Sequence, residues 1–485
     1  MPSDPLPVKI PLYEKLALDL ARQVELGTFR PGEKLPSVRE LSSQRNLSIT
    51  TVLQSYHLLE DQGLIESRPQ SGYFIVQQTR LTAVPEMSSP APDPTQVSGS
   101  ELTLMVLRDT HRSDLIQFGA GIAAPELLPT DRLKRIMLSI IRAGKSRENI
   151  VGETAGCIEL RMQVAQRSFP SGLDLRSEDI IITSGCSEAV YLSLQAICKP
   201  GDLVAIESPT YFGILQALEA QGLRALEIPT HPSSGISLSA LRFAVENHPV
   251  RACLVISNFN NPLGSCMPEE NKKELVALLA AHEIPLIEND IFGELYFSQQ
   301  RPGTAKAYDK KGLVLLCSSF SKDISPGYRL GWIAPGRFKQ KIELLKMSLN
   351  IGAPILPQLV VAEFLASGHY EHHLRTIRRA YARKVANMAQ SVLRYFPPGT
   401  RVTDPGGGFV LWVQMDEKVD SLELYKLALS AGITLAPGYL FSASPRYYNF
   451  IRLNAASWSE KSDPALKKLG QIVDRLARVS IKSQE

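Results

Sequence analysis

Lys322 stands in a sequence pattern that could do covalent chemistry. It ends the run Ser-Ser-Phe-Ser-Lys at residues 318–322, which follows a stretch of apolar residues, and Arg329 comes shortly after it. A lysine amine can form a Schiff base with an aldehyde, while hydroxyls and a planar guanidinium suit the oxygens of a phosphate group. A stretch of this kind could therefore hold an aldehyde that carries a phosphate group.

Polar residues also follow other apolar runs of the chain. They stand at residues 183–189 (Thr-Ser-Gly-Cys-Ser-Glu-Ala), 208–211 (Ser-Pro-Thr-Tyr), 258–264 (Asn-Phe-Asn-Asn-Pro-Leu-Gly), 288–290 (Glu-Asn-Asp) and 450–454 (Phe-Ile-Arg-Leu-Asn). In the first of these, a glycine turn between a strand and a helix would leave the amides of a helix N-terminus free to bind an anion. Each segment is a weak signal alone. Their occurrence together, in this order along the chain, strengthens the prediction of a site.

The elements that position these residues are predicted from apolar runs. Buried strands are expected at residues 180–183, 203–206, 225–228, 253–256, 286–287, 314–317 and 332–334, with helical stretches between most of them. Continuous apolar strands joined by crossovers are typical of a mostly parallel α/β sheet covered on both faces. After residue 336 we expect long helices, then a glycine run (406–408) that leads into a strand at 409–413, within a smaller α+β subdomain.

The first 78 residues follow a different pattern. Leucines and a valine four apart over residues 12–26 predict a helix, and Ser37 with Glu40 forms a capping box for a second helix. A third helix begins after Ser48 and ends near residue 63. Two short strands at 64–67 and 73–76 follow, joined by a turn-rich hairpin. Three helices and a two-stranded wing predict a winged helix-turn-helix.

Residues 31–76 resemble the GntR-type winged helix over their whole length. The resemblance implies that operator DNA is a partner and that the N-terminal part of the third helix enters the major groove. The DNA-binding residues that it implies are Ser37, Arg39, Ser48, Thr50, Thr51, Gln54, Arg68 and Gly72. The family often has arginine where this chain has Ile49 and Gln54, so the recognition helix is less basic. For a single hydroxyl such as Ser48 or Thr51, a simple helix-capping role remains an equal alternative.

The second part of the chain resembles the fold-type I aminotransferases, and the combination with a GntR-type head resembles the MocR family. The resemblance implies that pyridoxal 5′-phosphate (PLP) is the cofactor, with a Schiff base at Lys322 and a phosphate site. The phosphate ligands that it implies are Gly185, Cys186, Ser187, Ser319, Ser321 and Arg329. It also implies that Tyr211 stacks on the pyridine ring, that Asn261 bonds the 3-oxygen and that Asp290 pairs with the ring nitrogen. Arg452 would clamp the carboxylate of a substrate or amino-acid-like effector.

Two positions depart from the aminotransferase pattern. Phe292 stands where the family usually has a tyrosine that touches the 3-oxygen, and Val151 stands where a tyrosine often reaches the partner subunit's phosphate. Both changes remove a hydroxyl beside the cofactor, which is expected to impair catalysis more than binding. We therefore expect a homodimeric regulator that senses PLP or an effector, with weak or absent transamination. An active aminotransferase with an accessory head remains the alternative, while a PLP-free dimerisation domain is disfavoured by Lys322 and the phosphate residues.

Composition restricts the class of protein. The chain has 485 residues and a net charge of +4, and its first 78 residues carry eight Lys/Arg against nine Asp/Glu, so DNA binding rests on pattern and not on charge. No run approaches the roughly 20 apolar residues of a membrane helix, and six scattered cysteines indicate reduced thiols of a cytoplasmic protein.

We predict a head at 1–78, a Pro- and Ser-rich linker at 79–112 that ends in a short helix (102–108), and a PLP domain at 113–485, with no metal. The basic segment 369–384 is either a solvated helix face or a second DNA contact.

Overall fold

The computed structural model describes residues 11–482, apart from 26–27, 30–31, 62–63, 69–70, 76–83, 91–92, 99, 110–111 and 144–152. The chain divides into two compact units, one within residues 1–80 and 297–299 and the other within residues 81–296 and 300–485. Each unit has its own buried core, so the two are described separately. In the part of the chain that the structure describes, no helix is long and apolar enough to cross a membrane.

The small unit is the predicted winged helix-turn-helix. Its elements are α1 (Leu12–Glu25), α2 (Val38–Arg45), α3 (Ile49–Asp61), β1 (Ile65–Arg68) and β2 (Gly72–Ile75), with β1 antiparallel to β2. The apolar stripe of α3 places Val52, Tyr56 and Leu59 fully inside the core, as a helical period requires. The Tyr56 hydroxyl is satisfied there by donating to the carbonyl of Pro36 at 2.6 Å. The predicted three helices and two-stranded wing are confirmed.

The segment between the head and the main sheet is more structured than a linker. Residues Thr95–Gln96 form β3, which pairs antiparallel with β7 (Arg224–His231) at the edge of the main sheet. The predicted short helix is confirmed as α4 (Ser100–Asp109). The side chain of Ser88 also accepts from the backbone amide of Thr230 at 2.8 Å. This segment, which the sequence predicts to be extended and polar, is therefore bound to the large unit by backbone and hydroxyl contacts.

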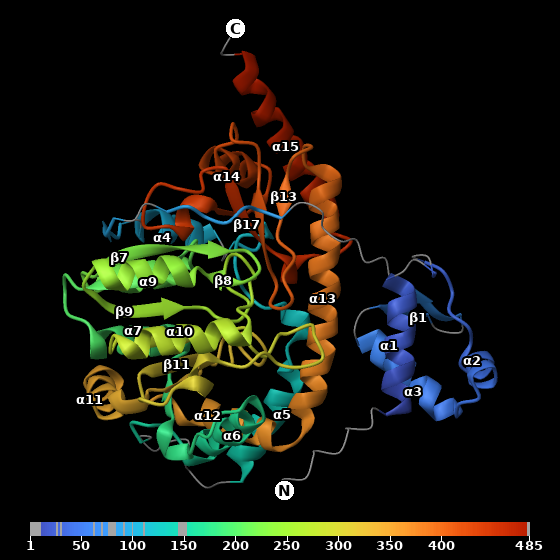
Figure 1. Ribbon diagram of the computed structural model, residues 1–485, viewed down its shortest axis with the longest axis horizontal. Coiled ribbons are helices and arrows are strands. Elements are labelled where there is room, and N and C mark those ends of the chain that lie inside the picture. The colour runs from blue at the N-terminus through green and yellow to red at the C-terminus, as the bar shows by residue number, and fades with distance from the viewer. Residues whose placement is uncertain are drawn as a thin grey trace, which may run out of the picture. The chain divides into compact units, whose positions relative to one another are not determined.

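The large unit is built on a mixed sheet with strand order β3-β7-β6-β9-β10-β11-β12-β5, and β8 pairs with β7 (Figure 1). Its other strands are β5 (Ile181–Thr183), β6 (Leu203–Ser208), β8 (Gly235–Ile236), β9 (Val250–Val255), β10 (Leu286–Asn289), β11 (Val314–Ser319) and β12 (Gly331–Ala334). The pairs from β7 through β11 are parallel, whereas β12 is antiparallel to both neighbours. The predicted mostly parallel sheet is confirmed, and every predicted apolar run forms one of its strands.

Helices cover both faces of this sheet. The intervening helices are α5 (Thr130–Arg142), α6 (Ile158–Ser168), α7 (Cys186–Ile197), α8 (Phe212–Ala220), α9 (Leu238–Asn247), α10 (Glu269–Ala281), α11 (Lys339–Asn350) and α12 (Ile355–Ala366). Side chains of α7 and α8 pack in one apolar cluster, and those of α9 and α10 pack in another. Successive residues of β10 alternate between them: Leu286 belongs to the α9–α10 cluster and Ile287 to the α7–α8 cluster. Because side chains alternate between the two faces of a strand, the same alternation decides which face each polar residue at the end of β10 takes.

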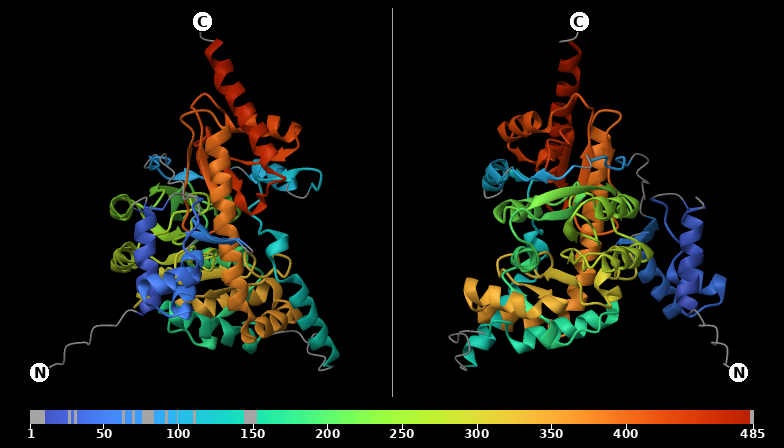
Figure 2. Two further views of the ribbon diagram at one scale, coloured as in Figure 1. Left: turned by 90° about the vertical axis from the view of Figure 1, so that its right-hand side faces the viewer. Right: turned by 60° about the vertical axis from the view of Figure 1, so that its left-hand side comes forward.

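The C-terminal part forms a second, smaller sheet with helices, as predicted. Strands β13 (Arg401–Val402), β14 (Val410–Gln414), β17 (Phe450–Asn454) and β16 (Ala436–Pro437) lie in that order, and β15 (Ile433–Thr434) pairs in parallel with β4 (Ile116–Gln117). The helices are α13 (His369–Tyr395), α14 (Ser421–Ser430) and α15 (Asp463–Lys482). The two views of Figure 2 show α13 running along the large unit to the small sheet.

Candidate functional site

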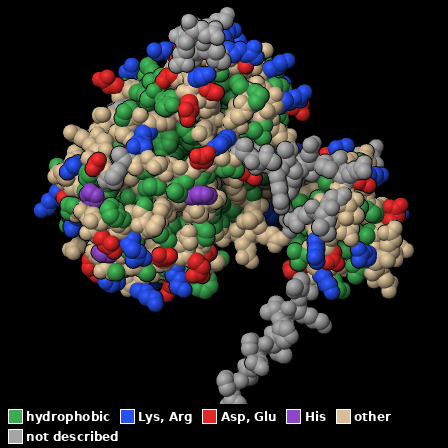
Figure 3. Space-filling model, turned by 45° about the horizontal axis from the view of Figure 1, so that its top comes forward, with side chains coloured by type: hydrophobic (Ala, Val, Ile, Leu, Met, Phe, Trp, Pro, Cys, Tyr) green, Lys and Arg blue, Asp and Glu red, His purple; other side chains and the backbone are tan. Residues whose placement is uncertain are grey.

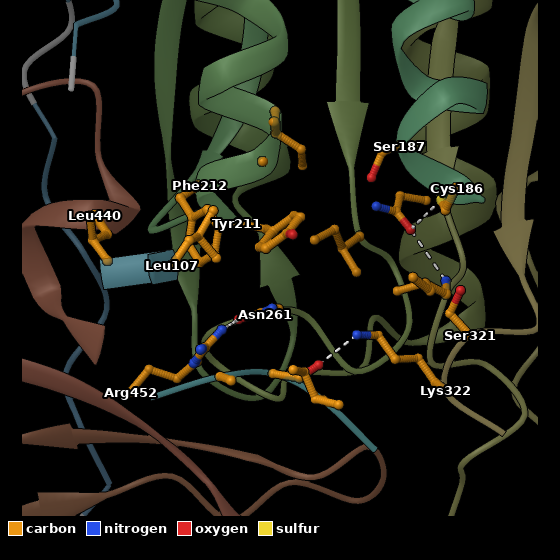
Figure 4. Close-up of a pocket in the computed structure, with 18 of the residues that line it drawn as sticks. Leu107, Cys186, Ser187, Tyr211, Phe212, Asn261, Ser321, Lys322, Leu440 and Arg452 are labelled. Atoms are coloured by element: carbon orange, nitrogen blue, oxygen red, sulfur yellow. Dashed lines mark hydrogen bonds between the residues drawn. The ribbon is translucent and has the colours of Figure 1, made fainter. Parts of the chain in front are cut away.

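A cavity of about 240 Å³ lies at the C-terminal ends of the parallel strands, beside the start of α7. Of the residues expected to bind cofactor or carboxylate, it is lined by Cys186, Ser187, Tyr211, Asn261, Ser321, Lys322, Arg329 and Arg452. Figure 4 shows Cys186, Ser187 and Ser321 grouped at one end of the cavity, with Arg452, Phe212, Leu107 and Leu440 toward the other. Ligand sites of α/β sheets commonly lie at this edge, where loops from several strands converge.

Lys322 follows β11 and reaches into the cavity. Its Nζ donates to the carbonyl oxygen of Gly121 at 2.6 Å and lies 5.6 Å from the ring centre of Phe292. Burial, together with the positive charges of Arg452 and Arg329, lowers the pKa of this amine to about 8. A neutral amine is the nucleophile in Schiff-base formation, so these surroundings make Lys322 reactive near neutral pH.

One end of the cavity is suited to an anion. Gly185, with a φ of 83°, is the N-cap of α7, and the helix begins at Cys186. The guanidinium of Arg329 lies so close that a Cβ at Gly185 would meet Nη2 at 2.8 Å. Ser321 lines the same end, and its hydroxyl lies 2.8 Å from that of Ser319, which is itself absent from the lining. Helix amides, an arginine and a serine are groups of the kind that bind phosphate oxygens.

Arg452 lies on β17 at the other end and is 1% exposed. Its Nη2 donates to the carbonyl of Gly119, and its Nη1 lies 3.4 Å from Oδ1 of Asn261. Among the described residues, its buried Nε has no hydrogen-bond partner. Burial also lowers the pKa of Arg452 to about 10, which reflects the cost of holding this charge away from water. A ligand carboxylate would offset that cost and satisfy the guanidinium.

Asp290, expected at the ring nitrogen, does not line this cavity. It lines a smaller one of about 50 Å³, together with Ser319 and Arg301. Its Oδ2 accepts from Nη2 of Arg301 at 2.5 Å, and its Oδ1 accepts from Nδ2 of Asn258 at 2.8 Å. The residue at the end of β10 that does line the larger cavity is its neighbour, Asn289. Residue type alone does not tell which face of a strand a side chain takes, so no motif pointed to Asn289.

Comparison with known proteins identifies both units. Residues 12–75 match the model for bacterial regulatory proteins of the gntR family, and residues 114–469 match aminotransferase class I and II. The chain is 39% identical over 468 residues to the protein named uncharacterized HTH-type transcriptional regulator YjiR of Escherichia coli K12, covering 96% of this chain and 99% of that one. The chain belongs to the aminotransferase class I and II family, in the MocR-like architecture.

Other relatives agree with this MocR-like assignment. The HTH-type transcriptional regulator NorG of Staphylococcus aureus (strain USA300) is 28% identical over 432 residues, covering 88% of this chain and 96% of that one. Among solved structures, the α-aminoadipate aminotransferase LysN of Thermus thermophilus, complexed with N-(5′-phosphopyridoxyl)-L-leucine, superimposes with a TM-score of 0.73 at 26% identity. The match covers 79% of this chain and 97% of LysN. PLP is the cofactor of this family, and the Lys322 amine and the anion end of the cavity fit it.

The MocR-like domain also shows where the departures from the aminotransferase pattern fall. Phe292 is fully buried, lines the cavity and packs edge-on against Phe409 at 5.2 Å. Val151 lies outside the described residues. The lining also includes Thr103, Val106 and Leu107 of α4, which no motif pointed to. Their contribution could be foreseen only by knowing where α4 packs.

In the winged head, the residues expected to meet DNA lie at two helix starts and in the wing. Ser37 caps α2 through a capping box with Glu40, and Ser48 accepts from the backbone amide of Thr51 at 3.0 Å. Thr50 and Gln54 are exposed on α3, and Arg39 is exposed on α2. Arg68 pairs with Glu66 at 2.7 Å and lies 4.3 Å over the ring of Phe74. Gly72 has a φ of 100° in the turn of the wing.

The basic segment of α13 divides between two environments. Arg378 pairs with Glu294 at 3.3 Å, Lys384 pairs with Glu126 at 3.0 Å, and His373 contacts the carbonyl of Asp323 at 2.6 Å. These three stabilise the large unit and are not available to a partner. His372, Arg375, Arg379 and Arg383 are exposed. Basic and acidic side chains are interspersed on the face of the molecule seen in Figure 3.

Proposed function

We propose that this chain is a PLP-binding transcriptional regulator whose affinity for operator DNA changes with PLP or an amino-acid-like effector. The observation that carries the proposal is the pairing, in one chain, of a GntR-family head with a cavity that holds a reactive Lys322 and a buried Arg452. The amine would hold the cofactor, and the guanidinium would hold the effector's carboxylate. When bound, PLP supplies the electron-withdrawing ring and aldehyde on which amino-acid chemistry in this family depends.

The effector end of the cavity supports an amino acid with an apolar side chain. Leu107 and Val106 come from α4, Phe212 begins α8, and Leu440 comes from the short 3-10 helix Gly438–Phe441. These side chains line the same cavity as Arg452, whose central guanidinium carbon lies 5.9 Å from the Phe212 ring centre. A carboxylate on Arg452 would direct the rest of the ligand toward this apolar wall.

Self-association is part of the proposal, because a GntR-type head would read paired half-sites as a dimer. It is supported by exposed apolar side chains on α5 and α6, two helices that both contact α12. Leu138 of α5 is 50% exposed, Met162 of α6 is 46% exposed, and Phe169 beyond α6 is 74% exposed. Analytical ultracentrifugation of the full chain should give a dimer, and a monomer at micromolar concentration would contradict this part. A cytoplasmic location belongs to the same proposal.

The test joins spectroscopy to DNA binding. The wild type, Lys322→Ala and Arg452→Met are loaded with PLP, titrated with a panel of amino acids and followed by absorbance, with keto acid assayed in parallel. We expect a band that needs Lys322 and shifts with an apolar amino acid only when Arg452 is present, without keto acid. Fluorescence anisotropy with the chain's own promoter DNA should change with the same amino acid. Sustained keto-acid production would instead favour the active aminotransferase.

The head is tested separately. Thr50→Ala and Gln54→Ala remove exposed side chains near the start of α3, so they should weaken operator binding about tenfold each while leaving the fold intact. His57→Ala, one turn further along the same helix and also exposed, is the matched control and should bind as the wild type does. Equal binding by the wild type and all three variants would show that these positions of α3 do not contact the DNA.

A further inference from the structure

We propose that in this chain the ring nitrogen of PLP is met by the neutral amide of Asn289, while Asp290 is withheld from the cofactor by Arg301. The inference rests on the proposed function in one respect, that PLP binds at Lys322. Asp290 is the residue that motif matching places at the ring nitrogen. The structure points to the residue one position earlier, and the two side chains differ by a full charge.

The alternation of β10 separates the two side chains. Ile287 packs with α7 and α8, so Asn289, two residues on, faces the same side and reaches the cavity. Glu288 faces the other way, where it accepts from the backbone amides of Ala305 and Lys306 at 2.7 and 2.9 Å. Asp290 continues on the side of Glu288, and its partners Asn258 and Arg301 lie there as well.

Asp290 is held in that position by a buried network of charges. Arg301 donates to Asp290 and also, from its Nε, to Glu294 at 2.8 Å, and Glu294 in turn pairs with Arg378 at 3.3 Å. Burial disfavours the Arg301 charge, but Asp290 and Glu294 outweigh it and raise the pKa of Arg301. A Cβ at Gly293 would meet both carboxylate oxygens of Asp290 at 2.4 Å, so glycine permits this packing. Turning Asp290 into the cavity would break a paired, buried charge network.

Asn289 is oriented by two contacts to its oxygen. Its Oδ1 accepts from the backbone amide of Ile291 at 3.2 Å and from the Cys186 thiol at 3.3 Å. Burial raises the pKa of that thiol well above its ordinary value, so Cys186 keeps its proton and donates. Since the oxygen is engaged, the amide nitrogen is the end of Asn289 that can donate to a ligand. An N–H donor suits a pyridine nitrogen that carries no proton.

The consequence is a cofactor site with a weak electron sink. A carboxylate beside the ring nitrogen favours the protonated, positively charged ring, and it is that charge which draws electrons from a bound amino acid. An amide brings no such charge, so the ring stays neutral while the phosphate end and Lys322 still hold the cofactor. A chain with this arrangement would bind PLP and an amino acid without efficient amino transfer, which is what a sensor requires.

The test reads the proton on the ring nitrogen directly. PLP labelled with ¹⁵N at the ring is bound to the full-length wild type, Asn289→Asp and Asp290→Asn, and ¹⁵N NMR spectra are recorded at neutral pH. We expect an unprotonated shift for the wild type and for Asp290→Asn, and a protonated shift for Asn289→Asp. Asn289→Asp should also convert bound PLP to its amine form with amino acids about 10²-fold faster, as expected when a charge-stabilising group is gained.

The possible outcomes distinguish a failure of this inference from a failure of the proposed function. A protonated ring in the wild type overturns the inference even if Asp290→Asn fails to fold, and leaves the PLP-binding regulator standing. An unprotonated ring in Asn289→Asp also overturns it. If no absorbance band depends on Lys322, PLP does not bind as proposed, and the function and the inference fall together.

Discussion

The Nζ of Lys322 donates to the carbonyl oxygen of Gly121, 2.6 Å away and 201 positions earlier in the chain. This bond holds the amine at the cavity wall, 5.6 and 5.9 Å from the ring centres of Phe292 and Phe409. The amine must leave the Gly121 carbonyl to bond a cofactor, and only its neutral form can do so. The electrostatics of this one position therefore govern how the protein takes up PLP.

Uptake of PLP should follow the ionisation of Lys322. Because burial and the nearby arginines lower the pKa of Lys322 to about 8, the rate of Schiff-base formation should rise about tenfold per pH unit below that value and level off above it. Stopped-flow absorbance between pH 6 and 10 measures this. In Arg452→Met the loss of a positive charge should move the break to higher pH. A rate still climbing steeply at pH 9.5 in the wild type would contradict the lowered pKa.

Gly331 should be intolerant of a side chain. A Cβ at this position would meet the carbonyl carbon of Gly185 at 2.5 Å, the oxygen of Ser318 at 2.7 Å and the amide nitrogen of Cys186 at 2.8 Å. Because all three are backbone atoms at the anion end, Gly331→Ala should displace the start of α7 and weaken PLP binding at least about tenfold. Gly327→Ala is the control, since only the Ser325 hydroxyl lies near, at 3.9 Å. Equilibrium dialysis with PLP compares the two, and equal affinities would refute the expectation.

Loss of Arg301 should destabilise the large unit. Arg301→Gln leaves the Asp290 carboxylate, which is 2% exposed, without its ion partner, and removing one member of a buried pair costs about 3–5 kcal/mol. Urea unfolding measures the loss. Arg242→Gln breaks a pair with Glu274 in which both side chains are at least half exposed, and it should cost less than about 1 kcal/mol. Similar losses in the two variants would show that Asp290 does not depend on Arg301.

Restoring the missing hydroxyl should lower the pKa of the Schiff base. In Phe292→Tyr a phenol would stand among the cavity residues, where it can donate to the 3-oxygen that the family's tyrosine contacts. That bond stabilises the charged oxygen and therefore the deprotonated form of the Schiff base. The absorbance midpoint should then move to lower pH. A spectrophotometric pH titration of the PLP-loaded variant checks the direction. An unchanged or higher midpoint would show that the hydroxyl does not reach the 3-oxygen.

Much of the fold follows from local pattern. The capping box at Ser37 and the four-residue apolar spacing of α1 and α3 predict the head, because a helix needs only near neighbours in the chain to form. Each apolar run of the large unit forms a strand of the main sheet, since fully buried parallel strands have no polar face to interrupt them. The edge strand β3 escaped prediction because its residues are polar and its pairing with β7 is non-local.

The candidate site, like the fold, was predicted in part from the sequence and in part decided by the tertiary structure. The sequence alone pointed to Lys322, Arg329 and Arg452, all of which line the cavity, because residue type and order suffice to match a family motif. Only the tertiary structure decided that α4 lines the cavity and that Asn289, not Asp290, faces it. The reason is that a strand turns each successive side chain to the opposite face, so a shift of one residue exchanges a charged group for a neutral one. Which face meets the cavity is set by the helices that pack there, and those contacts come from parts of the chain far away in the sequence.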